Sequence, residues 1–469
     1  MKTMAIVLLF SASCLAQPEP ATDWVTTYHG SGNARLHALL ATADGGCIAA
    51  GEVAAGPGEP SDFLVVRFNA SGDTMWTGCY GDSLADKAQA ICAAADGGFI
   101  IAGDSEEING FRDGLVLNID SEGTLLWQKR LGWVEQEDFL RAVVPLPDGD
   151  FALAGTFHDQ CLLARLDQSG DTLWTRRWDL RTGYTDLAHS LELTDDGGFL
   201  IGGQSYHDNY EWIDRYRQLI RTDSAGNLLW WDENYDGRYY AAIELADGNL
   251  AVAGEYQAAY LYLARFDSDG GLIWSHIYGT ATYNMIGFDM AETASGDLIV
   301  VGKEQTGPGL MDAVLLRVDA EGEELWRLQY DLAGMDSGHA LAILPDNSYL
   351  LAGGSQPGGD AFLIHTGTDS PQAVASVRSA SLAAIYEFSA YPNPCNPDLS
   401  IVFRLAAPGH SRVELFNLQG QHVAELAEGV LGAGVHRYQL QTDALASGIY
   451  FVSVQSDNSR LVRRITVLH

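Results

Sequence analysis

DSEGTLLW, residues Asp120–Trp127, is one copy of a phrase, D-x-x-G-x-x-x-W, that returns along the chain. The other copies are DQSGDTLW at Asp167–Trp174, DSAGNLLW at Asp223–Trp230, DSDGGLIW at Asp267–Trp274, DAEGEELW at Asp319–Trp326 and the variant NASGDTMW at Asn69–Trp76. Self-similarity at a fixed period is the signature of repeat architectures. The repeat therefore has to be defined before any copy is given a chemical role.

A second phrase, D-G followed by an apolar run and a Gly, has the same period. It occurs at Asp44–Gly51, Asp96–Gly103, Asp148–Gly155, Asp196–Gly203 and Asp247–Gly254, with degenerate copies at Ser295–Gly302 and Asp346–Gly353. The seven starts lie 48 to 52 residues apart. Each unit reads as four short strands separated by Gly- and Asp-rich turns. In the second unit these strands are Ala88–Ala95, Phe99–Ala102, Leu115–Ile119 and Leu125–Arg130.

Four strands per repeat of about 50 residues are typical of a β-propeller blade. The sequence thus predicts an all-β fold whose main part is a seven-bladed β-propeller. The seventh unit runs out after 361–365 without its D-x-x-G-x-x-x-W phrase, so it lacks an outer strand. The segment 23–28 carries the Trp24 and Tyr28 spacing of the outer strands. We expect this N-terminal strand to complete the last blade and to close the ring.

Within a blade, DSEGTLLW spans the turn between the third and fourth strands. Its Asp can bond the backbone two residues on, and its Gly favours a positive φ. Trp127 is expected to pack between neighbouring blades, so that Trp127→Ala costs about 3 to 5 kcal/mol. A calcium loop needs more oxygen ligands and a closing acidic residue, which DSEGTLLW lacks. We therefore expect no metal or cofactor here, with calcium as the weaker alternative.

Spacing from the D-G turns also selects candidate ligand-binding residues. Seven residues before each turn, at the start of each innermost strand, stand His37, Gln89, Arg141, His189, Tyr240, Phe288 and His339. They are predicted to surround the mouth of the central channel, on the face where propellers usually bind ligands. Ten residues before the turns, Asp recurs at Asp86, Asp138, Asp186 and Asp336. These carboxylates are expected to bond loop backbone, with a cation- or ligand-binding ring as the alternative.

Two long loops, 51–62 and 204–218, are further candidates for recognition. The second, QSYHDNYEWIDRYRQ, places Tyr210 and Trp212 beside Asp and Arg, a composition suited to protein or glycan contacts. The chain has no G-x-S-x-G, no H-E-x-x-H and no phosphate-binding loop. A binding or adhesion module is therefore predicted, and an extracellular propeller enzyme, glycan-active or of the pyrroloquinoline-quinone type, is the alternative.

Charge limits the partners. The 469 residues contain 62 Asp and Glu but only 27 Lys and Arg, for a formal net charge of −35. An acidic surface repels phosphate, so nucleic acid and anionic membranes are excluded as expected partners. The excess charge is ascribed to solubility, with an acidic cation-binding face as the alternative. We expect a monomer.

The first residues indicate export. Residues 1–16 combine Lys2, a short apolar run and a small-residue exit at Ala16, which is the pattern of a secretory signal peptide. Cleavage after Ala16 is predicted, with lipid attachment at Cys14 as the weaker alternative. Cys47, Cys92 and Cys161 fall in predicted strands and are expected to be small core residues, although a disulfide among Cys47, Cys79 and Cys92 remains open.

Two resemblances add to this reading. Units such as DKAQAICAAADGGFIIAGDS with DGLVLNIDSEGTLLWQKRLG resemble the delta-60-type tandem propeller repeats of secreted bacterial proteins, over residues 21–366. After a small, polar linker at 367–389, residues 390–469 resemble the C-terminal (type A) sorting domain of type IX secretion cargo. The residues that carry this resemblance are Tyr391, Pro392, Asn393, Pro394, Asn396, Pro397, Gly448 and Tyr450.

The second resemblance implies a small Ig-like β-sandwich, the type IX secretion machinery as a partner, and a secreted or outer-surface location. The chain departs from the family at Cys395, where Phe is usual, and at Arg463 and Arg464, where the family ends in Lys-rich sequence. These departures bear on cleavage and anchoring more than on the fold. An unknown extracellular protein or glycan is the expected ligand of the propeller.

Overall fold

The computed structural model of the protein describes residues 20–28, 33–54, 56, 58–82, 84–132, 136–208, 213–279, 284–307, 309–332, 334–356, 359–367, 385–391, 395, 398–405, 409–417, 421–432, 434–442, 445–456 and 459–467. They form strands and turns in two compact units, Met1–Ala373 and Val374–His469. Among these residues, no helix has the length and apolar character that crossing a membrane requires. The predicted signal peptide at 1–16 lies outside the described residues, as do residues 368–384 of the predicted linker at 367–389. The last five residues of that linker belong to a strand, Ile385–Tyr391.

The first unit is built from sets of four consecutive antiparallel strands. The first three sets are β2 (Ala34–Ala41), β3 (Cys47–Ala54), β4 (Ser61–Phe68), β5 (Thr74–Tyr80); β6 (Asp86–Ala93), β7 (Phe99–Glu106), β8 (Arg112–Ile119), β9 (Leu125–Leu131); and β10 (Asp138–Pro145), β11 (Phe151–Phe157), β12 (Gln160–Leu166), β13 (Thr172–Trp178). The next two are β14 (Thr185–Leu193), β15 (Phe199–Asp208), β16 (Ile213–Thr222), β17 (Leu228–Tyr235); and β18 (Gly237–Glu244), β19 (Leu250–Tyr256), β20 (Tyr260–Phe266), β21 (Leu272–Tyr278).

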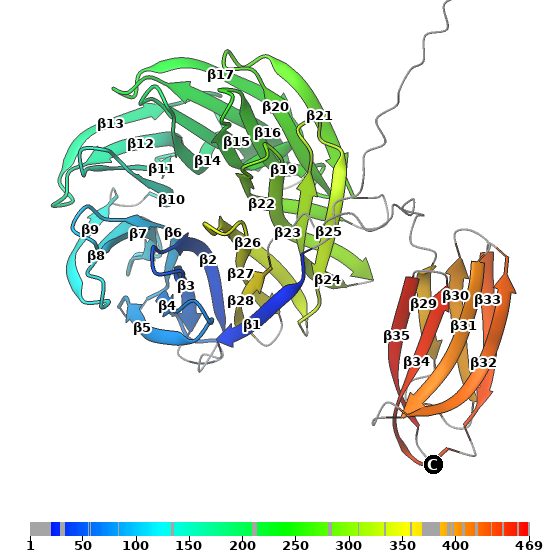
Figure 1. The fold of residues 1–469 in the computed structure, drawn as a ribbon. Coiled ribbons are helices and arrows are strands. Elements are labelled where there is room, and N and C mark those ends of the chain that lie inside the picture. The colour runs from blue at the N-terminus through cyan, green and yellow to red at the C-terminus, as the bar shows by residue number, and fades with distance from the viewer. Residues whose placement is uncertain are drawn as a thin grey trace, which may run out of the picture. The chain divides into compact units, whose positions relative to one another are not determined.

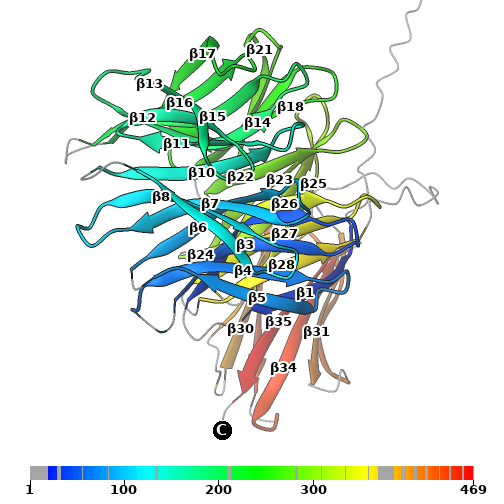
Figure 2. The same cartoon turned by 90° about the vertical axis from the view of Figure 1, so that its left-hand side faces the viewer.

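The last strands of this unit are β22 (Met285–Glu292), β23 (Leu298–Gly307), β24 (Leu310–Val318), β25 (Glu324–Tyr330), and then β26 (Met335–Ile343), β27 (Tyr349–Gln356) and β28 (Ala361–Thr366). A single parallel bridge between Met311 and Met335 joins β24 to β26. Figure 1 shows the sheets arranged around a common centre, with β2, β6, β10, β14, β22 and β26 innermost, and Figure 2 shows the same sheets from the side. This is a β-propeller.

The N-terminal strand lies against the last strand of the ring. β1 (Thr22–Tyr28) pairs antiparallel with β28, with Trp24 opposite His365 and Tyr28 opposite Ala361. The Trp24 indole stacks on the His365 imidazole with ring centroids 5.3 Å apart. The expected closure of the ring by segment 23–28 is therefore observed, and Figure 1 shows β1 beside β28.

The turn at the start of DSEGTLLW has the predicted form. The Asp120 carboxylate accepts hydrogen bonds from the backbone N–H groups of Glu122 (3.0 Å) and Thr124 (2.7 Å), and Gly123 has a φ of +85°. The Asp120 carboxylate thus makes its hydrogen bonds within its own turn. The phrase joins β8 to β9 and serves the fold.

Six outer-strand Trp side chains contact the next sheet around the ring. A Cβ placed on the positive-φ glycine of that sheet's turn would lie 2.7 to 3.2 Å from an indole carbon. The pairs are Trp24/Gly72, Trp76/Gly123, Trp127/Gly170, Trp174/Gly226, Trp230/Gly270 and Trp274/Gly322. The expected packing between neighbours is confirmed, but Trp127 remains partly exposed, whereas Trp326 is only 3% exposed. The expected cost of Trp127→Ala, which assumed full burial, is therefore too high.

The cores lie between adjacent sheets. One cluster joins Ile48 and Val65 of β3 and β4 to Ile101 and Leu117 of β7 and β8. Strands covered on both faces read as nearly continuous apolar runs, as in FIIAG of β7. Cys47, Cys92 and Cys161 are buried as expected, and the five described cysteines, which also include Cys79 and Cys395, are free thiols.

The second unit contains two sheets. One is formed by β29 (Ile385–Tyr391), β30 (Asp398–Leu405) and β33 (Gly434–Gln441), and the other by β32 (His422–Leu431), β31 (Gly409–Asn417), β34 (Gly448–Ser456) and β35 (Ser459–Val467). Side chains from both sheets share one core, for example Phe403 of β30 with Leu415 of β31 and Val452 of β34. Cys395 lies in the same core, fully buried. The unit is a two-sheet β-sandwich.

Candidate ligand-binding site at the channel mouth

Each innermost strand of the propeller carries a β-bulge at the same place. In β2 the pairing with β3 passes from Leu36 to Ala38 and skips His37. The residues skipped in β6, β10, β14, β18, β22 and β26 are Gln89, Arg141, His189, Tyr240, Phe288 and His339. A bulge adds one residue to a strand and re-aims its side chain. Spacing from the D-G turns thus selects the bulge residues but does not predict the bulges. The bulge residues stand four or five residues into the innermost strands rather than at the predicted start, because each strand begins earlier than predicted.

These bulge side chains meet in one open pocket of about 380 Å³ at the channel mouth. Its lining consists of His37, Gln89, Arg141, Leu187, His189, Arg238, Tyr240, Phe288 and His339. Leu187 and Arg238, which sequence reasoning missed, stand two residues before a bulge residue. Because side chains alternate along a strand, residues two apart share a face, and this period could have revealed them. A second pocket, of about 270 Å³, continues along the same strands.

One side of the mouth is aromatic. Among the described mouth residues, five rings follow one another across neighbouring sheets with centroid separations of 5.0 to 5.2 Å, in the order His189, Tyr240, Phe288, His339 and His37. Edge-to-face and tilted arrangements predominate, which suits the quadrupoles of aromatic rings. This row, which we call the ring arc, presents flat apolar surface at the rim of the pocket.

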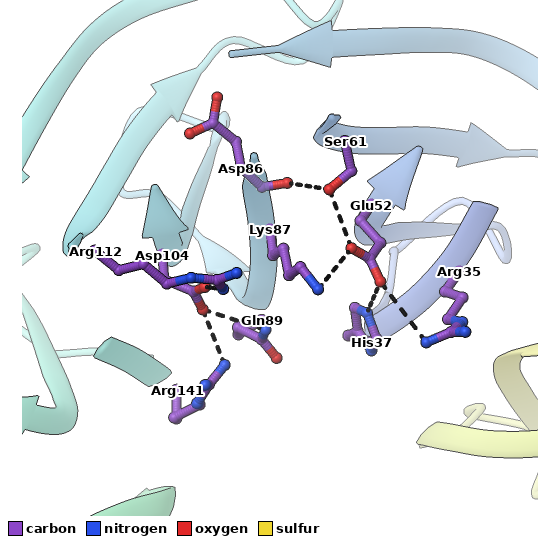
Figure 3. A network of polar contacts seen from close by, with 10 residues as sticks. All are labelled: Arg35, His37, Glu52, Ser61, Asp86, Lys87, Gln89, Asp104, Arg112 and Arg141. Carbon is purple, nitrogen blue, oxygen red and sulfur yellow. Dashed lines mark hydrogen bonds and ion pairs between the residues drawn. The ribbon is translucent and has the colours of Figure 1, made fainter. Parts of the chain in front are cut away.

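The other side of the mouth is polar and is tied to a buried carboxylate (Figure 3). Asp104 of β7 has no exposed surface, and it accepts hydrogen bonds from Arg112 (2.5 Å), Arg141 (3.0 Å) and the Gln89 amide (3.4 Å). Two arginines therefore share one buried carboxylate. The shared bonds also fix the directions of Gln89 and Arg141, the two bulge residues outside the ring arc.

A second carboxylate, Glu52 of β3, orders the neighbouring part of the rim. Its oxygens lie 3.2 Å from Lys87 Nζ and 3.6 Å from His37 Nε2, and Ser61 donates a hydrogen bond to it (3.2 Å). Burial alone would raise the pKa of Glu52, but contacts with His37 and Lys87 outweigh burial and lower it to about 2. Glu52 is therefore ionised at neutral pH, and its carboxylate holds the side chains of Lys87, His37 and Ser61 in place (Figure 3).

Further cations lie beside the ring arc. Arg238 pairs with the buried Glu255 at 3.0 Å, and its guanidinium carbon lies 5.4 Å from the Tyr240 ring centroid. Lys303 Nζ lies 5.5 Å from the Phe288 ring centroid. Burial, with a smaller contribution from Arg238, lowers the pKa of Lys303. Positive charge thus continues behind the aromatic side chains.

His189 stands between the two arginines of the pocket. Burial, and then the positive charges of Arg141 and Arg238, lower its pKa to about 3. Its Nε2 atom is buried and has no hydrogen-bond partner in the described structure. Burial and the neighbouring positive groups also hold the pKa of His339 well below its usual value. Both imidazoles are neutral at pH 7.

Farther along the channel the lining becomes acidic. Burial, followed by Glu244 and Asp289, raises the pKa of Glu192 to about 7, and burial raises that of Asp289 to about 6. Asp289 accepts backbone N–H bonds from Met290 and Leu341, both at 2.8 Å. The second pocket is therefore less positive than the mouth.

The recurring aspartates at the start of four innermost strands bond loop backbone. Asp86, Asp186 and Asp336 each accept a backbone N–H bond from the preceding loop, at 3.0, 2.7 and 2.7 Å, and Asp138 accepts one from His158 at 2.9 Å. This is the anchoring role expected from the sequence. Asp336 also approaches Asp312 and Asp331, with carboxylate oxygens within 4.8 Å of one another, a grouping that the sequence analysis did not predict.

The remaining predicted residues fall into two groups. Tyr210 and Trp212, and Pro392, Asn393, Pro394, Asn396 and Pro397 of the sorting motif, lie outside the described residues. In the second unit, Tyr391 of β29 pairs with Ser400, and the Tyr450 hydroxyl donates to the Ala446 carbonyl at 3.1 Å. Gly448, which begins β34, pairs with Val467.

Three solved structures that match this chain have low sequence identity to it. PorZ, a surface component of the type-IX secretion system of Porphyromonas gingivalis, is 13% identical with a TM-score of 0.44; the match covers 91% of this chain and 59% of PorZ. Virginiamycin B lyase from Staphylococcus aureus is 10% identical with a TM-score of 0.46, and the match covers 73% of this chain and 98% of the lyase. Puromycin hydrolase is 15% identical with a TM-score of 0.48, covering 81% of this chain and 60% of the hydrolase.

A search of curated proteins found no match. A family model for the secretion system C-terminal sorting domain matches residues 389–468, which fall in the second unit. The match covers the segment where the sequence analysis recognised the sorting motif. The protein therefore carries a type IX secretion system C-terminal sorting domain and is secreted or held at the outer cell surface.

Proposed function

We propose that this protein is a recognition protein that holds its ligand at the channel mouth of a seven-bladed propeller. The repeats are of the delta-60 type, and β1 completes the seventh blade. The C-terminal sandwich is Ig-like and brings the chain to the type IX secretion machinery. The ligand is an extracellular protein or glycan, and the protein acts as a monomer without a cofactor.

The observation that carries this proposal is the contrast between repeated and varied positions. The turn Asp, the turn Gly and the outer Trp recur from blade to blade, because each serves the fold in the same way. At the bulges the backbone repeats but the side chains do not, and imidazole, amide, guanidinium, phenol and phenyl groups meet in one pocket. Repeated geometry with varied chemistry favours recognition of a ligand that lacks the symmetry of the ring.

Glu52 and His189 of the mouth do not titrate near neutral pH, which favours binding over catalysis there. The carboxyl groups whose pKa values are raised toward neutrality, Glu192 to about 7 and Asp289 to about 6, lie farther along the channel. A general acid or base works best with a pKa near the operating pH. The pKa of Glu52 is lowered to about 2 and that of His189 to about 3. Asp104 is fully buried and held by two arginines. We therefore propose a binding protein rather than a glycan-active or quinone-dependent enzyme.

The test is binding of the purified mature protein to arrays of extracellular proteins and glycans. Arg141→Gln and Tyr240→Ala should each weaken the strongest signal about tenfold or more, as truncation of a residue in a binding pocket does. Arg176→Gln and Tyr235→Ala, on the outer strands β13 and β17, are matched controls that should leave it unchanged. A signal lost in Trp212→Ala but intact in both mouth variants would move the site to loop 204–218.

Export is tested separately. Deletion of 390–469 should remove the protein from the medium and the cell surface, and fusion of 390–469 to an unrelated exported protein should carry that protein there. Surface appearance of the deletion variant would contradict the role proposed for the second unit.

A further inference from the structure

The mouth is a positively charged site in an acidic protein. The chain has 62 acidic and 27 basic residues, yet the residues that line the mouth pocket include Arg141 and Arg238 and no carboxylate. Behind them, within the described residues, four more cations adjoin the rim: Arg35, Lys87, Arg112 and Lys303. The carboxylates that form ion pairs with them, Asp104, Glu52 and Glu255, are buried or nearly buried. The exposed Glu137 also interacts electrostatically with Arg112 and Asp104.

In their ion pairs these cations share three carboxylates, and the lining of the pocket itself has two arginines and no carboxylate, which the overall charge would not predict. The carboxylates lie behind the cations, since their side chains are 0%, 13% and 4% exposed. Arg141 keeps 23% of its side chain exposed and Arg238 keeps 22%. Positive groups therefore face the pocket, where a low-dielectric wall strengthens their attraction for an anion.

The second feature of the mouth is its flat apolar surface. Tyr240 and Phe288, at the middle of the ring arc, lie 5.0 Å apart by ring centroid and both line the pocket. Faces and edges of this kind pack against a planar or ring-shaped group. His189, which lies between Arg141 and Tyr240 in the ring order, offers a buried Nε2 that lacks a partner. An unpartnered polar atom in a pocket gains from a hydrogen-bonding ligand.

We propose that the mouth binds a small ring-bearing carboxylate, with the carboxylate at Arg141 and the ring against Tyr240 and Phe288. The inference rests on the proposed binding function and adds the chemical class of the ligand. Two sources supply this chemistry: an acidic sugar, whose ring also carries hydroxyl groups for His189, and an aromatic acid.

The experiment is calorimetric titration of the full mature protein with two pairs of probes. Glucuronate is compared with neutral methyl glucoside, and phenylacetate with its neutral amide. Because hydrogen bonds to a charged group are worth about 1.5 to 3 kcal/mol, the acid of each pair should bind about tenfold to a hundredfold more tightly than its neutral partner. The preferred acid identifies the source, and its affinity should fall as salt is raised.

The decisive variant is Arg141→Gln, which should abolish the preference for the acid. Asp104 keeps Arg112 and Gln89 as partners in this variant, so we expect it to fold, and its circular dichroism should match that of the unchanged protein. Arg176→Gln, on β13, is the matched control and should leave the preference intact. Equal affinity for acid and neutral probes, no measurable binding of either acid, or an acid preference that persists in Arg141→Gln would each overturn the inference.

The outcomes also separate this inference from the proposed function. Array binding that is lost in Tyr240→Ala but unchanged in Arg141→Gln would keep the mouth as the site and overturn the anionic ligand. Array binding that neither variant affects would overturn both.

Discussion

The indole of Trp127 lies over Gly170 of the following sheet, so closely that a Cβ on Gly170 would come within 2.7 Å of an indole carbon. Gly170 also has a φ of +77°, which L side chains rarely adopt. Two constraints of different origin therefore meet at one residue. One comes from the turn itself, and the other from the neighbouring blade.

Gly170→Ala should separate these constraints when compared with Gly97→Ala. Gly97 has a φ of +87°, and a Cβ there would meet nothing within 4 Å, so the substitution carries the backbone strain alone, about 1 to 2 kcal/mol. Gly170→Ala should lower the free energy of unfolding by about 1 kcal/mol more, because the indole must shift. Denaturant unfolding of both variants measures the difference. Equal destabilisation would show that Trp127 moves aside at no cost.

Trp326→Ala should destabilise the propeller more than Trp127→Ala. Trp326 is 3% exposed and packs with Tyr349 and Leu351, so its loss should cost about 3 to 5 kcal/mol. Trp127 keeps part of its surface in water, and about 1 to 3 kcal/mol is expected there. Thermal unfolding followed by tryptophan fluorescence and circular dichroism ranks the two. The reverse order would contradict the burial argument.

Deletion of 22–28 should leave the edge of β28 unpaired. The expected results are a lower Tm and concentration-dependent aggregation, because an open edge pairs with other chains and Trp24 no longer covers Gly72. A synthetic peptide of residues 22–28 added in trans should restore the Tm, and the same peptide with Trp24→Ala should restore less. A deletion variant as stable and monomeric as the full chain would refute closure by β1.

Acid should weaken the propeller through His189. Its pKa is lowered from 6.5 to about 3 in the folded protein, so as the pH falls the unfolded chain takes up this proton first. Neutral His189 therefore makes its full contribution to the free energy of unfolding above about pH 6.5. This contribution is lost as the pH falls toward about 3.

His189→Phe should remove up to about 1.4 kcal/mol per pH unit from the slope of unfolding free energy against pH in this window. Urea unfolding at a series of pH values measures the slope. His276→Phe, on the outer strand β21, is the control that tests whether the effect belongs to the mouth. An unchanged slope in His189→Phe would show that the imidazole takes up its proton in the folded state as easily as in the unfolded chain.

Much of the fold followed from spacing. The two repeated phrases placed the turns, and the N-terminal Trp24 and Tyr28 pattern predicted the pairing of β1 with β28 that the structure shows. Counting back from the turns also reached the bulge residues, because every repeat has the same number of residues between its bulge and its turn. Arg238 was missed, since only the alternation of β18 brings it to the pocket beside Tyr240.

The sequence by itself determined the periodic features: four strands per repeat, the Asp and Gly of each turn, and the sorting motif after the repeats. These depend on local backbone preferences, which residues close in the chain decide. The tertiary structure decided which side chains meet across the ring. That Asp104 joins Arg112 to Arg141, that Trp127 covers Gly170, and that five rings form one arc all depend on contacts between blades, which arise only when closure brings distant strands together.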